Sequence, residues 1–202
     1  MTPDEPFRSE HAQAFILAGG QSRRMGSDKA RLPWNGQPIV ERIRDAITTS
    51  VAHVWLVCKV DSGCEDLGLP ILYDRAPGRA LVYGLQAALE APGPPWRFVL
   101  ACDMPGVDGG VLSALWHTAH AAGAPGSYPR HALDGTVDPL PSLWHRDVAL
   151  RCGAGWGLAA RGWVERAGLV PWFVPAALQT RLANVNTPED WKDWQCRARD
   201  AQ

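Results

Sequence analysis

The sequence predicts an α/β fold in which helices cover both faces of a mostly parallel β-sheet, with a small antiparallel excursion in the C-terminal half. Short apolar runs that end at turn residues alternate with helix-period segments through the first 120 residues, and this alternation is typical of right-handed βαβ units. The clearest apolar run, residues 96–102, leads directly into a polar turn. Residues 127–144 instead read as short strands and turns, which favours antiparallel pairing there.

The first half of the chain supplies four predicted strands and three predicted helices. Residues 13–18 read QAFILA and stop at a Gly-Gly pair, as a buried strand does when it enters a turn. A basic, glycine-rich segment follows to about residue 37. Pro38 then suits the first turn of a helix, in which Ile39 and Ile43 recur at helical spacing. Apolar runs and breakers place the remaining strands at 53–58, 71–73 and 96–102, and the remaining helices at 81–89 and 108–121.

The second half contains two further predicted helices, near residues 155–168 and 188–199. The later helix has a clear beginning, because Thr187 can cap it and Pro188 suits its first position. Residues 1–12 are polar and contain two prolines, so we expect a flexible N-terminal tail. No linker or repeat divides the remainder of the 202 residues, so residues 13–199 are expected to form a single domain.

Composition and charge exclude several classes of protein. The formal charge is −1, which provides no general attraction for nucleic acid or for an anionic membrane. No window has the roughly 18 uninterrupted apolar residues that a membrane span needs, and the acidic start of the chain has no signal-peptide pattern. The five cysteines are scattered without a CxxC pair, which fits reduced thiols. We therefore expect a soluble cytoplasmic protein that binds neither nucleic acid nor a membrane.

The segment LAGGQSRRMGSDK, residues 17–29, carries the strongest chemical signal. It follows the first predicted strand, and ligands of open parallel sheets bind beyond the carboxyl ends of the strands. Its glycines allow backbone N–H groups to approach an anion, and residues 23–31 hold four basic side chains against one acidic. Lys29 is one of three lysines in a chain with 17 arginines, which favours a compact point charge there.

This segment predicts a phosphate cradle, and a solvated turn with surface arginines is the alternative. Two known phosphate-binding patterns are excluded. The Walker A pattern is absent because Gly26 is followed by Ser27, and the GxGxxG dinucleotide fingerprint does not fit so long and basic a loop.

Two later segments complete the candidate site. Asp103 directly follows the strongest predicted strand, so its carboxylate is expected at the same sheet edge as the glycine-rich segment, where it suits Mg²⁺. The alternative role of Asp103 is to cap the turn before Pro105. The other segment is NVNTPED, residues 184–190, which a helix start preceded by an asparagine turn explains by itself.

At these three places the sequence resembles the MobA-like nucleotidyltransferase family, which includes the molybdenum cofactor guanylyltransferases. The resemblance rests on LAGGQSRRMGSDK (17–29), DMP (103–105) and NVNTPED (184–190), in the matching order and spacing. It implies a Rossmann-like three-layer domain that transfers a nucleoside monophosphate, GMP from GTP, to a phosphorylated acceptor such as molybdopterin and releases pyrophosphate. It also implies Mg²⁺ as the cofactor, and molybdoenzymes or other cofactor-biosynthesis proteins as partners.

The resemblance also implies roles for individual residues. Arg24 and Lys29 would stabilise the β- and γ-phosphates, and Asp103 would hold the metal, so these three form the catalytic set. Asp74, at the end of a predicted strand, resembles the acidic residue that reads the N1–H and amino edge of guanine. The nucleotide would contact Leu17, Ala18, Gly19, Gly20, Lys29, Asp74 and Asp103, and the acceptor or the metal would contact Asn184 and Asn186.

The sequence departs from the family pattern at two places. Residues 80–84 keep only the final glycine of the expected GPLxG turn, and residues 152–157 lack the arginine expected before the penultimate helix. These departures keep alternatives open. One is a cytidylyltransferase, another is a nucleotidyltransferase for a different small acceptor, and a third is a carrier that binds nucleotide or cofactor without turnover.

Two side-chain patterns allow more than one interpretation. His117 and His120 lie three residues apart on a predicted helix, which suits a polar face or a metal pair. Trp144 and Trp156 suit packing in the core or, in a protein of this family, stacking on a pterin.

Overall fold

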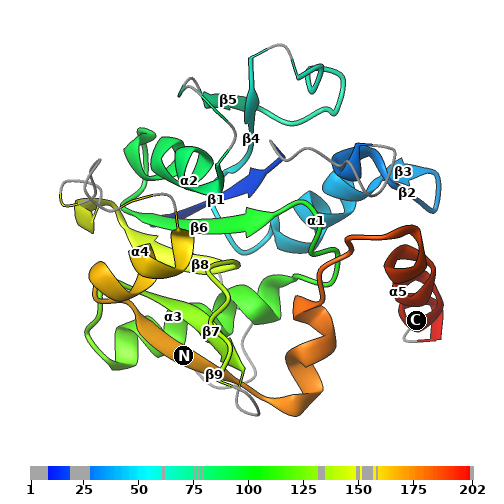
Figure 1. Ribbon diagram of the computed structural model, residues 1–202. Helices are drawn as coiled ribbons and strands as arrows, with labels where there is room; N and C mark the ends of the chain where they lie inside the picture. Colours follow the sequence, from blue (N-terminus) through cyan, green and yellow to red (C-terminus); the bar gives the residue numbers. More distant parts are fainter. Residues whose placement is uncertain are drawn as a thin grey trace.

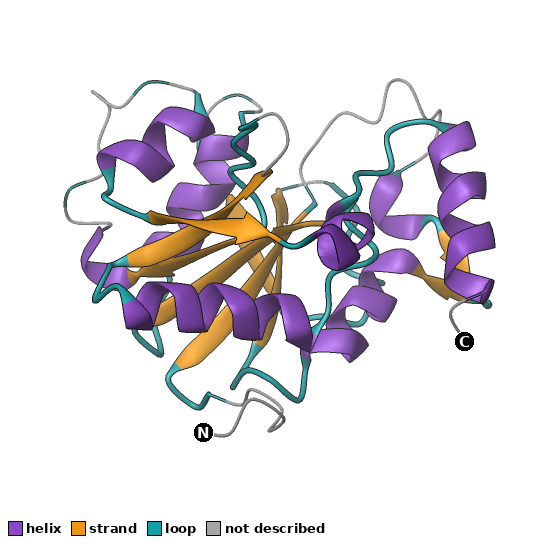
Figure 2. Cartoon of the chain, turned by 90° about the horizontal axis from the view of Figure 1, so that it is seen from below, coloured by secondary structure: helices purple, strands orange, loops and turns teal. Residues whose placement is uncertain are grey.

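The computed structural model describes residues 9–18, 28–60, 62–74, 76, 78, 80–131, 135–148, 151, 157 and 159–200. Its centre is a seven-stranded sheet with helices on both faces, accompanied by a separate two-stranded hairpin (Figure 1, Figure 2). The three-layer α/β prediction is therefore confirmed. None of the helices in these ranges is long and apolar enough to cross a membrane.

The described sheet is parallel except for one strand. Its first four strands in spatial order form parallel pairs; they are β5 (Ile71–Asp74), β4 (Val54–Lys59), β1 (Ala12–Leu17) and β6 (Trp96–Ala101). β8 (Ser142–His145) comes next and is antiparallel to both of its neighbours, β6 and β7 (Gly126–His131). β7 then pairs in parallel with β9 (Val170–Val174) at the edge. The predicted antiparallel excursion is thus the single strand β8.

The strands are connected by α-helices, short 3₁₀ turns and loops. The α-helices are α1 (Ile39–Ile47), α2 (Leu81–Glu90), α3 (Gly109–Ala121), α4 (Ala160–Arg166) and α5 (Pro188–Asp200). The 3₁₀ turns are η1 (Lys29–Arg31), η2 (Arg146–Val148) and η4 (Ala176–Leu182). The hairpin consists of β2 (Pro33–Trp34) and β3 (Gln37–Pro38).

The predicted bounds of α1 and α4 differ from those in the structure. Pro38 ends β3 and precedes α1, so it lies just outside the first helical turn that we predicted for it. α4 begins at Ala160 and ends at Arg166, whereas the prediction ran from 155 to 168; residues 152–156 and 158 lie outside the described residues.

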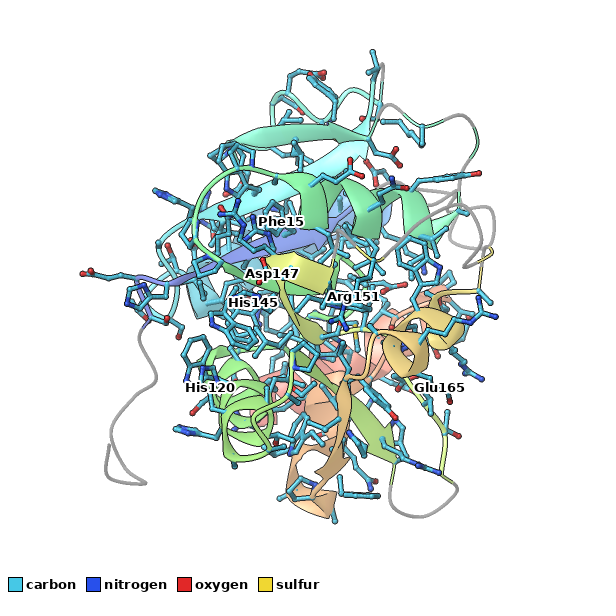
Figure 3. The ribbon with its side chains drawn as sticks, turned by 90° about the vertical axis from the view of Figure 1, so that its left-hand side faces the viewer. Phe15, His120, His145, Asp147, Arg151 and Glu165 are labelled. Carbon is cyan, nitrogen blue, oxygen red and sulfur yellow. The ribbon has the colours of Figure 1, made fainter. Side chains whose placement is uncertain are left out.

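The central strand β1 is buried at all six positions. Phe15, labelled in Figure 3, is fully buried, as are the flanking residues Ala14 and Ile16. Gln13 is equally buried, and its side chain donates to the carbonyl of Pro92 at 2.9 Å and accepts from the indole of Trp55 at 3.2 Å. Strands covered on both faces read as continuous apolar runs, which is why QAFILA shows no alternation.

In a second, smaller apolar cluster beside the main core, α5 packs against the β2–β3 hairpin (Figure 2). The rings of Trp191 and Trp194 are stacked with centroids 5.2 Å apart, and Trp34 meets Trp194 edge-on at 4.8 Å. Val185 is buried in the same cluster. The cluster therefore anchors the chain immediately before α5, where one of the predicted site segments lies.

The cysteines support the expectation of reduced thiols within the described part of the chain. Cys58, Cys64, Cys102 and Cys196 are all free. Burial raises the pKa of the Cys58 thiol to about 11 and also raises the pKa of Cys102. Both thiols therefore stay protonated and unreactive near neutral pH.

Candidate active site

The carboxyl ends of four parallel strands bring the predicted site segments to one edge of the sheet. β1 and β6 pair so that Leu17 lies opposite Ala101, and the amide of Cys102 donates to the carbonyl of Leu17 at 3.2 Å. Asp103 therefore follows its strand at the edge where the segment after Leu17 begins. This juxtaposition confirms the placement predicted for the two segments, and this edge is where open α/β sheets bind ligands.

Lys29 lies at the centre of this edge. Its Nζ is 2.9 Å from Oδ2 of Asp103 and donates to Oδ1 of Asn186 at 2.6 Å. Lys29 begins the 3₁₀ turn η1, which Asp28 caps by accepting from the amide of Ala30 at 3.0 Å. The side chains of Lys29 and Asp103 are 17% and 21% exposed, so the pair is accessible to a ligand. Three segments far apart in the sequence thus meet at one ammonium group.

The segment 184–190 serves both as a helix start and as part of the site. The amide of Val185 donates to the main-chain carbonyl of Asp103 at 2.8 Å. Thr187 Oγ1 accepts from the amide of Asp190, while Asp190 accepts from the amides of Asn186 and Thr187 at 2.9 Å. These amide hydrogen bonds hold the pKa of the Asp190 carboxyl below its usual value. The reciprocal cap fixes Asn186 beside Lys29, and Asn184 is exposed one residue before Val185.

Asp74 lies at the same edge and is engaged by a lysine. Its Oδ2 is 2.8 Å from Nζ of Lys59, and its Oδ1 accepts from the amide of Ala76 at 2.9 Å. Lys59 also donates to the carbonyl of Ala76 at 2.8 Å, and its ammonium lies 5.4 Å from the ring centroid of Tyr83. Asp74 is only 6% exposed. Asp74 was predicted as a site residue and Lys59 was not, although a rare lysine at the end of a buried strand was a usable signal.

The stretch 80–84, which departs from the family pattern, forms the start of α2. A Cβ on Gly84 would lie 3.3 Å from Cδ2 of Leu17. Glycine at this position therefore allows α2 to pack closely on the end of β1. Three of the predicted site residues, Gly19, Gly20 and Arg24, lie outside the described residues, whereas Ala18 continues β1 and its amide donates to Val57 at 2.8 Å.

The oxygen donors around Lys29 fit a hard divalent cation that also binds substrate. A carboxylate oxygen of Asp103 and an amide oxygen of Asn186 converge on the Lys29 ammonium, and oxygen is the ligand atom that Mg²⁺ prefers. The described residues contain no group of three or more His, Cys, Asp and Glu side chains that could hold a metal. Mg²⁺ typically uses one or two protein carboxylates and takes its other ligands from phosphate and water, so Asp103 with Asn186 fits that ion.

Comparison with known proteins decides the family. The profile of the MobA-like NTP transferase domain matches residues 14–167. The chain belongs to the MobA-like NTP transferase family. It is 32% identical over 192 residues to a probable molybdenum cofactor guanylyltransferase of Chloroflexus aggregans, covering 88% of this chain and 90% of that protein. It is 33% identical over 138 residues to a protein of the same description from Haloferax mediterranei, covering 65% of this chain and 64% of that protein.

A solved structure shares the fold. The molybdopterin-guanine dinucleotide biosynthesis protein A of Archaeoglobus fulgidus superimposes with a TM-score of 0.75 at 23% identity, covering 93% of this chain and 99% of that one. This protein therefore shares the overall fold of that structure.

The structure decides one of the predicted side-chain alternatives, that of Trp144, and shows the surroundings of His120. Trp144 is fully buried, and its indole donates to Oγ of Ser142 at 2.7 Å, so it belongs to the core and presents no face to a pterin. The ring of His120 stacks on Trp116 with centroids 3.9 Å apart. His120 and His145, labelled in Figure 3, both pack against Trp96 at the start of β6, the opposite end of that strand from Asp103. Trp156 lies outside the described residues.

Gly106 allows the 3₁₀ turn η4, which we did not predict, to pack against the turn that follows Asp103. A Cβ on Gly106 would lie 2.7 Å from the carbonyl oxygen of Arg181 and 2.8 Å from its Cα, so backbone fills the space that a side chain needs. We expect Gly106→Ala to push η4 from the turn and to lower the free energy of unfolding by about 1–3 kcal/mol. Urea denaturation measures this loss.

Gly162→Ala is the matched control, because Gly162 is within α4 and a Cβ there meets no atom within 4 Å. Alanine favours a helix over glycine by up to ~1 kcal/mol, so this variant should unfold at an equal or higher urea concentration. Equal stability of the two variants would contradict the packing that we describe at Gly106.

Proposed function

We propose that the protein is a cytoplasmic, Mg²⁺-dependent guanylyltransferase that transfers GMP from GTP to a phosphorylated acceptor, molybdopterin. The observation that carries the proposal is the convergence of Lys29, Asp103 and Asn186 at the sheet edge of a MobA-like domain. The names of the curated relatives support a guanine nucleotide and the molybdenum cofactor as the two substrates. The free thiols of the described cysteines suit a reducing compartment.

In the proposed reaction, a phosphate oxygen of molybdopterin attacks the α-phosphorus of GTP. A new phosphoanhydride bond forms, the bond between the α-phosphorus and its bridging oxygen to the β-phosphate breaks, and pyrophosphate leaves with that oxygen. No group on the protein becomes covalently modified. The protein accelerates the reaction by aligning the two phosphates and by compensating the negative charge that gathers on them.

Each site residue has a distinct task in this proposal. Lys29 leaves the oxygens of Asp103 and Asn186 and places its positive charge on the triphosphate, together with Arg24. Asp103 and Asn186 would hold Mg²⁺ through their oxygens, and the bound ion would neutralise phosphate charge and stabilise the leaving group. The apolar end of β1 at Leu17 and Ala18 supports the nucleoside. Asn184, which is exposed, faces the acceptor. The proposed protein partners of this enzyme are other cofactor-biosynthesis proteins or molybdoenzymes.

The test is pyrophosphate release, measured with GTP, CTP, ATP and UTP in the presence of molybdopterin and Mg²⁺. We expect release with GTP and a loss of release when EDTA is added. Thermal shift with the same four nucleotides provides a binding measurement, since a ligand at 100 times its Kd stabilises the folded state by about 2.7 kcal/mol. Release with CTP alone would instead identify a cytidylyltransferase, and tight binding with no release would identify a carrier.

The Asp74 carboxylate is expected to select guanine, because guanine offers N1–H and amino donors while cytosine offers an acceptor at N3. We therefore expect Asp74→Asn to weaken GTP binding by roughly 10- to 100-fold and to change CTP binding much less. Isothermal titration with both nucleotides measures the two affinities. An equal loss for GTP and CTP would remove the guanine assignment.

A further inference from the structure

Lys59 and Asp74 form a second charged pair at the carboxyl edge of the sheet, separate from the Lys29 cluster. The two residues are register partners at the ends of β4 and β5. Their side chains are 15% and 8% exposed, and Nζ of Lys59 lies 2.8 Å from Oδ2 of Asp74. A buried ion pair gains little net stability over apolar packing, because both charges lose their hydration. Its position at a ligand-binding edge points to recognition.

The pair keeps hydrogen-bonding capacity for a ligand. An ammonium has three N–H donors, and the described partners of Lys59 are two oxygens, on Asp74 and on the main chain of Ala76. A carboxylate has about four acceptor positions, of which Asp74 uses two, for Lys59 and for the Ala76 amide. Counting only the contacts with described residues, the pair therefore has one donor directly beside a carboxylate acceptor.

We propose that Lys59 is a base-reading residue that donates to O6 of guanine while Asp74 accepts from N1–H and the amino group. The proposal rests on the guanylyltransferase function above and adds a specificity determinant to it. An aromatic ring suited to a planar base adjoins the pair, because the Lys59 ammonium lies over the ring of Tyr83. Two large apolar residues are exposed next to these elements in the sequence: Val60, which follows Lys59, is 52% exposed, and Leu81, which begins α2, is 39% exposed.

The order of donor and acceptor sets which bases are accepted. Guanine presents a carbonyl oxygen next to a ring N–H, which matches an ammonium next to a carboxylate. Adenine and cytosine present an amino group next to a ring acceptor, which is the reverse arrangement, so the amino group would face the ammonium. Uracil has the guanine-like pair O4 and N3–H but lacks the amino group, so it should rank between guanine and cytosine.

A purely structural role makes a different prediction. In that case Lys59 only neutralises Asp74 and ties the residues after β5 to the sheet. Losing Lys59 would then weaken every guanine nucleotide by the same factor, since the base would never touch the ammonium. A nucleotide altered only at position 6 separates the two roles, because only direct contact with O6 senses that change.

The experiment measures Kd by isothermal titration for GTP, 6-thio-GTP and ITP with the full-length wild type and with Lys59→Met. 6-Thio-GTP keeps N1–H and the amino group but replaces O6 by a poor acceptor, and ITP keeps O6 but lacks the amino group. We expect the wild type to prefer GTP over 6-thio-GTP by roughly 10- to 100-fold, as a charged hydrogen bond allows. In Lys59→Met this ratio should fall to about 1, while the preference for GTP over ITP, read by Asp74, persists.

Lys192→Met is the matched control, since Lys192 is exposed on α5 and its loss removes the same charge; its ratio should equal that of the wild type. Lys59→Gln retains an N–H donor for the buried Asp74, so it keeps the measurement possible where the methionine variant fails to fold, and its ratio should fall at least threefold. An unchanged 6-thio ratio in both Lys59 variants would overturn the proposal. A wild type that does not prefer GTP over CTP would instead contradict the proposed function.

Discussion

Replacing Asp103 by alanine is expected to lower the rate of pyrophosphate release by roughly 100- to 1,000-fold, or about 3–4 kcal/mol of transition-state stabilisation. The carboxylate is the acidic group that Lys29 contacts at the sheet edge, at 2.9 Å. Its removal deprives the proposed metal of its protein carboxylate and removes one oxygen contact of Lys29, whose contact with Asn186 remains. Single-turnover measurements with GTP and molybdopterin give the rate of the chemical step.

The fold of the Asp103→Ala variant should persist. The hydrogen bond that holds Val185 uses the main-chain carbonyl of Asp103, which alanine retains, and the lost side chain is 21% exposed.

Asp108→Ala is a control that should lower stability and leave activity nearly unchanged, because Asp108 caps α3 by accepting from the amide of Val111 and pairs with Arg181. Loss of that cap should cost about 0.5–2 kcal/mol of stability with little change in turnover. Pyrophosphate release at the wild-type rate from Asp103→Ala would refute the role of the carboxylate.

The strand ends were the most predictable part of this site. Leu17 lies near the end of one apolar run and Asp103 directly follows another, and parallel pairing places such strand ends at one edge of the sheet. Local chemistry also identified the helix start at Thr187, which the structure confirms through its reciprocal bonds with Asp190. Features determined by neighbouring residues in the sequence are therefore predictable here.

Lys59 was missed for a local reason. The predicted strands ended at residues 58 and 73, each one residue short of the end of β4 or β5, so the pairing of Lys59 with Asp74 was not foreseen. A shift of one residue at a strand end is enough to hide a register partner, because pairing between strands is not a property of either sequence segment.

Two elements after residue 160, β9 and η4, were not predicted because their formation depends on tertiary contacts. β9 reads VPWFV, in which Pro171 interrupts an otherwise strand-like run, and an edge strand tolerates proline. The 3₁₀ turn η4 lies against Gly106, about 70 residues earlier in the chain, and only that contact reveals why the turn after Asp103 requires glycine. Such contacts leave no periodic signal in the sequence.

Lys29 is the residue at which sequence and structure assign different contacts, and a substitution tests both. From the sequence we expected Lys29 to contact the phosphates. In the structure, Lys29 contacts Asp103 and Asn186. An ammonium 2.9 Å from a carboxylate repels any second cation that approaches the same oxygen. Both assignments hold if Lys29 contacts Asp103 and Asn186 before the nucleotide binds and contacts the triphosphate oxygens afterwards.

Lys29→Met removes the charge while keeping the length of the side chain, so two opposite effects are expected. Turnover with GTP should fall by roughly 100- to 1,000-fold, because the charge on the phosphates loses a fixed partner. Binding of Mn²⁺ without nucleotide should tighten by about tenfold, because Asp103 no longer has a competing cation beside it. Electron paramagnetic resonance of free Mn²⁺ measures the second effect independently of activity. Lys192→Met, which removes an exposed lysine of α5, should show neither effect, and unchanged Mn²⁺ affinity in Lys29→Met would show that the ammonium and the metal use different oxygens.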